Sequence, residues 1–146
     1  MNLHSETRLR VRYAETDQMG VVYYANYLIW MEVARTDFCL HSGFRYRDME
    51  IEDGIRIAVA EARCRYRKPA RYDDEILIRT TLTQLRRRTM TFTYQVHHAE
   101  SEELLAEGHT LHVAVDAEGR PRGVPSRQFA LLSSYLIPPP GDPSPD

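Results

Sequence analysis

Between residues 24 and 41, apolar side chains recur at steps of three and four, which is the pattern of an amphipathic helix. A second apolar stripe flanks the first, so most of the helix circumference is apolar. The glycine of the following Ser42-Gly43 pair is the expected helix stop, because glycine readily adopts the left-handed conformation that ends many helices. We expect this helix to be covered on several sides. The two stripes comprise Tyr27, Trp30, Met31, Ala34 and Phe38, and Ile29, Val33 and Leu40, respectively.

The rest of the hydrophobic pattern predicts five strands, at residues 8–13, 55–66, 75–85, 89–98 and 104–116. In the second of these, the alternation of apolar residues changes phase near Val59-Ala60, which predicts a bulge or a bend. Short helical segments are expected at residues 46–49 and 127–135. One strand, one long apolar helix and four strands joined by short turns indicate an α+β fold. We expect an antiparallel sheet of five strands wrapped around one long central helix.

The chain of 146 residues is long enough for one domain with a sizeable core, and we place that domain at residues 1–137. The remaining residues, 138–146, are rich in proline and are expected to be disordered.

Composition excludes several classes of protein. A formal net charge of −2 gives no electrostatic reason to expect nucleic-acid binding. No apolar run approaches the roughly 18 residues that span a bilayer, and the first residues lack the apolar core of a signal peptide. The two cysteines, Cys39 and Cys64, have neither metal-binding nor redox spacing, and we interpret them as reduced, buried thiols. These features favour a cytoplasmic protein without a membrane span.

Two pairs of histidines, His97-His98 and His109 with His112, are candidates for a metal site. Adjacent residues of a strand point to opposite faces of the sheet, and so do residues three apart, so neither pair converges on one ion. The sequence also lacks a G-x-S-x-G nucleophile elbow, a glycine-rich phosphate loop and a dinucleotide-binding fingerprint. We therefore expect no metal and no bound redox cofactor.

The stretch before the long helix carries the candidate chemistry. Asp17 lies in a polar loop that ends at Gly20, where glycine supplies either a positive φ or room for a ligand. The helix that follows begins with free backbone N–H groups, which stabilise negative charge. A carboxylate beside such a helix start suits attack on a carbonyl carbon, or its hydration.

The sequence Y-A-E-T-D-Q-M-G-V-V-Y-Y-A-N-Y, residues 13–27, resembles the motif of the hotdog-fold acyl-CoA thioesterases. The closest resemblance is to the 4-hydroxybenzoyl-CoA thioesterase branch, which includes the thioesterases associated with the Tol–Pal system. It extends over residues 9–132, with weaker matches at Pro69-Ala70, Asp73-Asp74 and residues 86–89. Many bacterial members have histidine where this chain has Tyr24, whereas the hydroxybenzoyl-CoA branch has tyrosine there. The motif is met by Tyr13, Asp17, Gly20, Val21, Val22, Tyr23, Tyr24, Asn26 and Tyr27.

The resemblance implies that Asp17 either attacks the thioester carbonyl as a nucleophile or, as a general base, activates a water molecule that does. It also implies that the backbone N–H of Tyr24, helped by the helix dipole, polarises the carbonyl group and holds the oxyanion. Each residue also has a structural alternative. In these alternatives, Asp17 serves only to form the turn of its loop, and Tyr24 contributes only its phenol, as part of the wall of the acyl pocket.

The basic run Arg86, Arg87 and Arg88 is the candidate for binding the phosphates of coenzyme A, because arginine suits phosphate geometry. Lys68 and Arg71 are weaker additions. The alternative for all of them is an ordinary charged surface.

Four more residues complete the predicted substrate site. Glu61, on a strand expected to face the site, orients water or substrate. Asn26 caps or braces the helix entry, and Gly20 closes the loop. Tyr13 flanks the acyl group or, in the alternative, is a tyrosine at the edge of the core.

By this resemblance the chain is expected to hydrolyse an aryl-CoA or short-chain acyl-CoA, with coenzyme A present only as part of the substrate. Members of the family form dimers with sheets joined edge to edge, often paired into tetramers, and their sites lie at subunit interfaces. The alternative from another class is a non-catalytic module that binds acyl-CoA or acyl carrier protein. A hotdog dehydratase is expected to show an active-site histidine in a different motif, which this sequence lacks.

Overall fold

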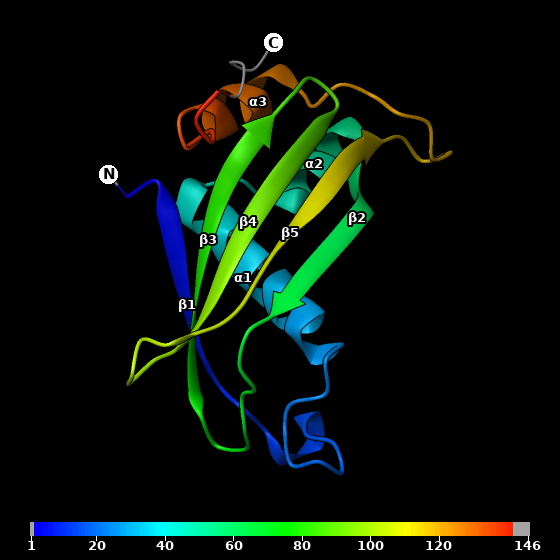
Figure 1. The fold of residues 1–146 in the computed structure, drawn as a ribbon. Coiled ribbons are helices and arrows are strands. Elements are labelled where there is room, and N and C mark those ends of the chain that lie inside the picture. The colour runs from blue at the N-terminus through cyan, green and yellow to red at the C-terminus, as the bar shows by residue number, and fades with distance from the viewer. Residues whose placement is uncertain (1, 142–146) are drawn as a thin grey trace.

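In the computed structural model, which describes residues 2–141, five strands form one antiparallel sheet with the order β1-β3-β4-β5-β2. The strands are β1 (His4–Arg10), β2 (Arg56–Tyr66), β3 (Glu75–Leu85), β4 (Thr89–His98) and β5 (Leu104–Val115). The helices are α1 (Asn26–Ser42), α2 (Tyr46–Asp53) and α3 (Ser126–Ser133). Figure 1 shows α1 lying across one face of the sheet, with α3 at one end. The predicted α+β class and antiparallel hotdog sheet are confirmed.

The first apolar stripe of α1 forms the centre of the core. Its five members are buried, and they pack toward the face of β4 that carries Met90, Phe92, Tyr94 and Val96. The second stripe behaves differently, because Ile29, Val33 and Leu40 remain about half exposed. Within one chain, therefore, α1 is covered on the side of the sheet, and the expected cover on its other sides is not supplied by the described residues.

Two features of the sequence correctly predicted where α1 ends and where β2 is irregular. Gly43 has φ +81° and ends α1, as the helix stop predicted. The register of β2 against β5 shifts between Val59 and Glu61, so the predicted bulge at Val59-Ala60 is confirmed. The segment predicted as one helical turn at residues 46–49 extends to Asp53 as α2.

The first strand was predicted four residues too late. β1 begins at His4 rather than at residue 8, because the side chains that it turns toward the core include Ser5 and Thr7, which break the apolar alternation. Tyr13, predicted at the end of this strand, instead begins a single 3₁₀ turn, Tyr13–Glu15.

Gly108 of β5 allows the long helix to approach the sheet closely. A Cβ atom at this position would overlap the carbonyl oxygen of Arg63 in β2 and would lie 2.8 Å from Cε of Met31 in α1. Glycine is therefore required here for close approach, and not for an unusual φ.

The described residues after α3 lack regular secondary structure. Residues 138–141 contain no helix or strand, and residues 142–146 of the predicted tail lie outside the described residues. The assignment of residues 1–137 to one domain stays a prediction. Across residues 2–141, every helix is too short or too polar to cross a membrane.

Candidate active site

The loop that carries Asp17 is closed by its own backbone. The N–H of Asp17 donates to the carbonyl of Val21 (2.9 Å), and the N–H of Gly20 donates to the carbonyl of Asp17 (3.0 Å). Gly20 has φ +79° with open space around a Cβ built there, so the turn, and not a close approach within the chain, requires glycine.

One oxygen of the Asp17 carboxylate holds the loop and the other is available for chemistry. Oδ1 accepts the backbone N–H of Met19 at 2.8 Å, which is the turn-forming role expected as the alternative. Among residues 2–141, Oδ2 accepts no hydrogen bond. The half-buried side chain therefore serves the turn through one oxygen and leaves the other without a hydrogen bond to the described residues.

Glu15, which the sequence did not single out, anchors this loop to the long helix. Its side chain is 6% exposed and accepts hydrogen bonds from the backbone N–H of Arg12 and the indole N–H of Trp30, both at 2.8 Å. Burial raises the pKa of Glu15, but these bonds and the Arg12 guanidinium outweigh that effect and leave the pKa below its usual value. Glu15 is therefore a buried anion that ties the loop to α1.

The backbone of Glu15 also positions the entry of α1. Its carbonyl oxygen accepts the backbone N–H of Tyr23 and the side-chain amide of Asn26, both at 2.8 Å. The backbone N–H of Asn26 in turn donates to the carbonyl of Tyr23 (2.9 Å). Asn26 thus braces the helix entry instead of capping its own helix, since the cap residue Ala25 precedes it.

The first turn of α1 leaves the backbone N–H of Tyr24 without an acceptor. The N–H groups of Asn26, Tyr27 and Leu28 bond to carbonyls three residues back, and the described residues provide no hydrogen-bond acceptor for the N–H of Ala25 or of Tyr24. Since free N–H groups at a helix start carry partial positive charge, the N–H of Tyr24 is available to stabilise an anion.

Asp17 and Tyr24 line one cavity of about 300 Å³ beside the start of α1. Its remaining wall is largely apolar and aromatic, with two cations, Arg67 and Lys68, that follow β2. Tyr27 lies at its inner side and accepts the backbone N–H of Ala70 through its phenol oxygen (3.2 Å). The lining residues are Asp17, Met19, Val21, Val22, Tyr24, Tyr27, Tyr66, Arg67, Lys68 and Pro69. A carboxylate, a free N–H and an apolar wall together suit the attack on a carbonyl carbon.

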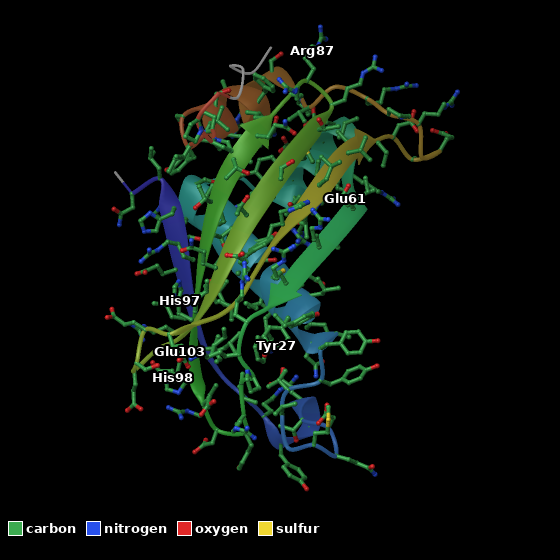
Figure 2. All side chains as sticks on the ribbon, in the orientation of Figure 1. Tyr27, Glu61, Arg87, His97, His98 and Glu103 are labelled. Carbon is green, nitrogen blue, oxygen red and sulfur yellow. The ribbon has the colours of Figure 1, made fainter. Side chains whose placement is uncertain are left out.

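Several predicted site residues lie away from this cavity in the single chain. Tyr13 is 77% exposed and packs edge-on against Tyr72, with ring centroids 5.7 Å apart. Glu61 bonds through Oε1 to Nε2 of His109 (3.0 Å). Figure 2 shows Glu61 and Arg87 well separated from Tyr27.

The basic run 86–88 forms the turn between β3 and β4, whereas the Asp17 loop lies at the other end of the sheet (Figure 1). One chain therefore does not bring Arg86, Arg87 or Arg88 to the cavity. Of the two weaker candidates, Lys68 lines the cavity, and Arg71 uses its backbone N–H to bond the Asp74 carboxylate (2.9 Å).

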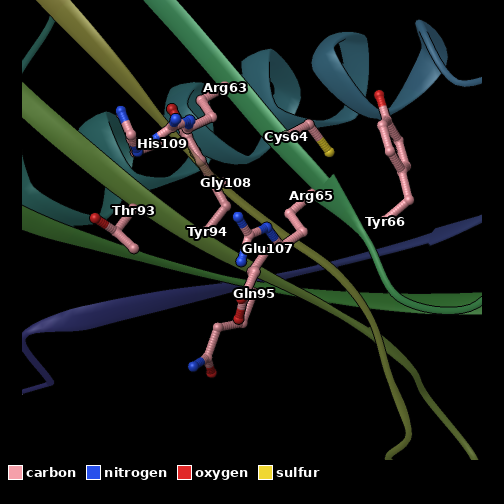
Figure 3. A pocket seen from close by; sticks show the side chains of 10 residues that line it. All are labelled: Arg63, Cys64, Arg65, Tyr66, Thr93, Tyr94, Gln95, Glu107, Gly108 and His109. Atoms are coloured by element: carbon pink, nitrogen blue, oxygen red, sulfur yellow. The ribbon is translucent and has the colours of Figure 1, made fainter.

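A larger cavity of about 670 Å³ crosses β2, β4 and β5 (Figure 3). Its walls combine Arg63 and Arg65 with Gln95 and Glu107, and the carboxylate of Glu107 is paired with Arg67. It contains neither Asp17 nor a helix start. The larger cavity therefore lacks the candidate catalytic groups, and the smaller cavity is the candidate active site.

The histidines do not gather into a metal site within residues 2–141, where no group of three His, Cys, Asp or Glu side chains converges. His109 contacts Glu61, while His112 is buried and bonds Oγ1 of Thr110 at 2.7 Å, so these two point to opposite faces as their spacing predicted. Burial lowers the pKa of His112 to about 4, which keeps it neutral in the core.

Comparisons with known proteins find similar proteins over most of the chain. Residues 11–140 match the family model of the thioesterase-like superfamily. The chain is 38% identical over 114 residues to the putative acyl-CoA thioesterase YneP of Bacillus subtilis, covering 78% of this chain and 81% of that protein. It is 36% identical over 118 residues to the acyl-CoA thioester hydrolase YbgC of Escherichia coli, covering 80% and 87%. The crystal structure of the DHNA-CoA thioesterase from Staphylococcus aureus has a TM-score of 0.82 and 32% identity, covering 90% and 87%.

Proposed function

Because the chain belongs to the thioesterase-like superfamily, we propose that it hydrolyses acyl-CoA thioesters to a carboxylic acid and free coenzyme A. The observation that carries this proposal is that Asp17 and Tyr24, whose backbone N–H has no acceptor among the described residues, line the same cavity. The names of the relatives, acyl-CoA thioesterase and thioester hydrolase, support it.

In the proposed reaction, the thioester carbonyl lies between Asp17 and the start of α1. Asp17 either adds to the carbonyl carbon itself or takes a proton from the water that adds. The negative charge that develops on the carbonyl oxygen is stabilised by the N–H of Tyr24, and a donor of this kind contributes about 100- to 1000-fold in rate. Collapse of the tetrahedral intermediate breaks the C–S bond and expels the coenzyme A thiolate, which takes up a proton. If water has added, the acyl group leaves directly as the carboxylic acid; if Asp17 has added, the acyl group remains on Asp17 as an anhydride, which a water molecule then hydrolyses to the acid and the free carboxylate.

The walls of the cavity support a compact acyl group. Its volume of about 300 Å³ and its tyrosines suit an aryl ring or a short aliphatic chain. We assign Arg67 and Lys68, the two cations of its lining, to the phosphates of coenzyme A in the same chain; without substrate they pair with Glu107 and Glu103, respectively.

Release of free thiol from a panel of benzoyl-, propionyl- and palmitoyl-CoA tests this function. We expect turnover of benzoyl- or propionyl-CoA, with kcat/KM at least ~10-fold above that of palmitoyl-CoA, because the long chain exceeds the cavity. Tight binding of acyl-CoA with no turnover of any member would identify a non-catalytic binding module instead.

We propose further that two copies of the chain pair through α1 and β2, as a dimer or as half of a tetramer. Support comes from the half-exposed stripe of Ile29, Val33 and Leu40, and from β2, which has β5 as its one sheet neighbour in the described residues. Since Arg87 lies far from the cavity of its own chain (Figure 2), the basic run would serve the site of the second copy.

Replacing Val33 by glutamate tests the pairing. A charge in an apolar interface is costly, so Val33→Glu is expected to weaken self-association at least ~10-fold. Analytical ultracentrifugation of wild type should give the mass of two or four chains. The control is Ala130→Glu on the exposed side of α3, which should keep the wild-type mass. A monomeric wild-type protein, or a Val33→Glu variant that associates as tightly as wild type, would contradict the pairing.

A further inference from the structure

We propose that Tyr66 is a positioning residue whose phenol holds the start of α1 so that the N–H of Tyr24 faces the thioester carbonyl. This role rests on the proposed function and adds a residue to it. Tyr66 is the last residue of β2 and lines the candidate active site together with Asp17 and Tyr24. Its hydroxyl donates a hydrogen bond of 2.9 Å to the carbonyl oxygen of Tyr24.

The start of α1 needs such a support from outside the helix. The cap residue Ala25 makes no side-chain hydrogen bond, and the N–H groups of Tyr27 and Leu28 make long bonds of 3.3 and 3.2 Å. The N–H of Tyr27 reaches the carbonyl of Tyr24 at 3.3 Å, at the weak end of the range for hydrogen bonds between backbone groups. The phenol of Tyr66 therefore makes the shorter of the two bonds to this carbonyl.

Hydrogen bonds on both sides of Tyr24 fix the direction of its N–H. The peptide group before it is held through the carbonyl of Tyr23, which accepts the N–H of Asn26 at 2.9 Å. The peptide group after it is held through the bond from Tyr66. The N–H of Tyr24 belongs to the first of these peptide groups, and the bond from Tyr66 anchors the second. Because both peptide groups that flank the Cα atom of Tyr24 are held, rotation about its backbone torsions is restricted and the N–H is oriented before substrate arrives, and such preorganisation is the basis of oxyanion stabilisation.

The ring of Tyr66 is itself held in place. It packs edge-to-face on Tyr27, with ring centroids 5.1 Å apart, and the phenol of Tyr27 accepts the N–H of Ala70. Burial, followed by its contact with Cys64, raises the pKa of Tyr66 above its usual value. The phenol therefore stays protonated and keeps donating its hydrogen bond through the neutral and mildly alkaline range.

Tyr66→Phe removes the hydroxyl and keeps the ring. We expect kcat for the best acyl-CoA to fall about 10-fold while KM stays within about 2-fold, because the donor is misaligned and not removed. The midpoint of thermal unfolding should change little, since the aromatic packing is kept. Tyr72→Phe, an exposed tyrosine outside the cavity, is the matched control and should keep wild-type kinetics.

An NMR readout on the free protein separates positioning from general stability. The carbonyl that accepts the phenol shares its peptide group with the N–H of Ala25, so the ¹⁵N shift of Ala25 should change in Tyr66→Phe and not in Tyr72→Phe. Unchanged kcat in Tyr66→Phe would overturn the proposal, as would a rise in KM alone or a fall in kcat with no change at Ala25. A wild-type protein that hydrolyses no thioester would instead overturn the proposed function itself, whatever the NMR result.

Discussion

Asp17→Asn is expected to lower kcat by about 1000-fold or more, because a neutral amide neither takes a proton from water nor attacks a thioester effectively. The fold and the binding of acyl-CoA should survive. The amide oxygen of asparagine can still accept the N–H of Met19, the bond through which Asp17 serves its turn. Steady-state thiol release, with binding followed separately by calorimetry, measures both effects.

Asp116 provides a matched control for this variant. It also closes a turn, accepting the backbone N–H groups of Glu118 and Arg120 at 3.0 Å, but it lies outside the candidate active site. Asp116→Asn should therefore keep nearly full activity. An Asp17→Asn protein that retains more than about a tenth of the wild-type kcat would exclude Asp17 as the catalytic carboxylate.

Glu15→Ala is expected to lower the free energy of unfolding by about 3 kcal/mol, because it leaves the indole N–H of Trp30 and the backbone N–H of Arg12 without an acceptor. Glu15→Gln keeps one acceptor oxygen and should cost about half as much. Chemical denaturation measures both. Glu100→Ala, in the exposed turn after β4, is the control and should be nearly neutral.

The pH dependence of this effect has a defined sign. The pKa of Glu15 is lower in the fold than its ordinary value of 4.5, so its contribution is fully present above about pH 5 and is lost as the pH falls through the lowered pKa. The stability difference between wild type and Glu15→Gln should therefore shrink as the pH falls below the ordinary pKa of 4.5 and through the lowered one. A difference that grows on acidification would show that Glu15 is held in its neutral form.

The main elements of the fold were predictable because apolar periodicity reports burial directly. Apolar residues are buried in the first apolar stripe of α1, glycine ends α1 at Gly43, and the apolar alternation breaks where β2 has its bulge beside Val59. At each of these places the residue type corresponds to the structure, so the sequence predicted it. β1 was misplaced because Ser5 and Thr7 are buried polar residues, and no periodicity reports them. The second apolar stripe of α1 consists of residues typical of a core but is half exposed in one chain. The sequence alone therefore did not show which protein surface covers it.

The candidate site was predictable only where its residues are close in the sequence. Asp17 and Tyr24 fall within one motif and meet in one cavity. Tyr66 and Lys68 line the same cavity, from the end of β2 and the segment after it. The spacing of residues along the chain does not show at which end of the sheet a strand residue lies, so their place in this cavity could not be predicted. The basic run 86–88 was grouped with the site for the same reason, although its turn lies at the other end of the sheet (Figure 1).

Glu15 is a different kind of omission. In the sequence it is one polar residue among several in a loop, and nothing in its neighbours marks it as buried. The available signal is Trp30. It lies on the first apolar stripe of α1, where its indole N–H is buried and needs an acceptor.

The most direct test of the central claim compares hydrolysis at equal occupancy of the site. Wild type and Asp17→Asn are each loaded with the best acyl-CoA of the panel, at concentrations where calorimetry shows both to be saturated, and thiol release is then followed in a single turnover. The account predicts similar dissociation constants, with release of coenzyme A from wild type and about 1000-fold slower release from the variant. Comparable release from both proteins would contradict the account.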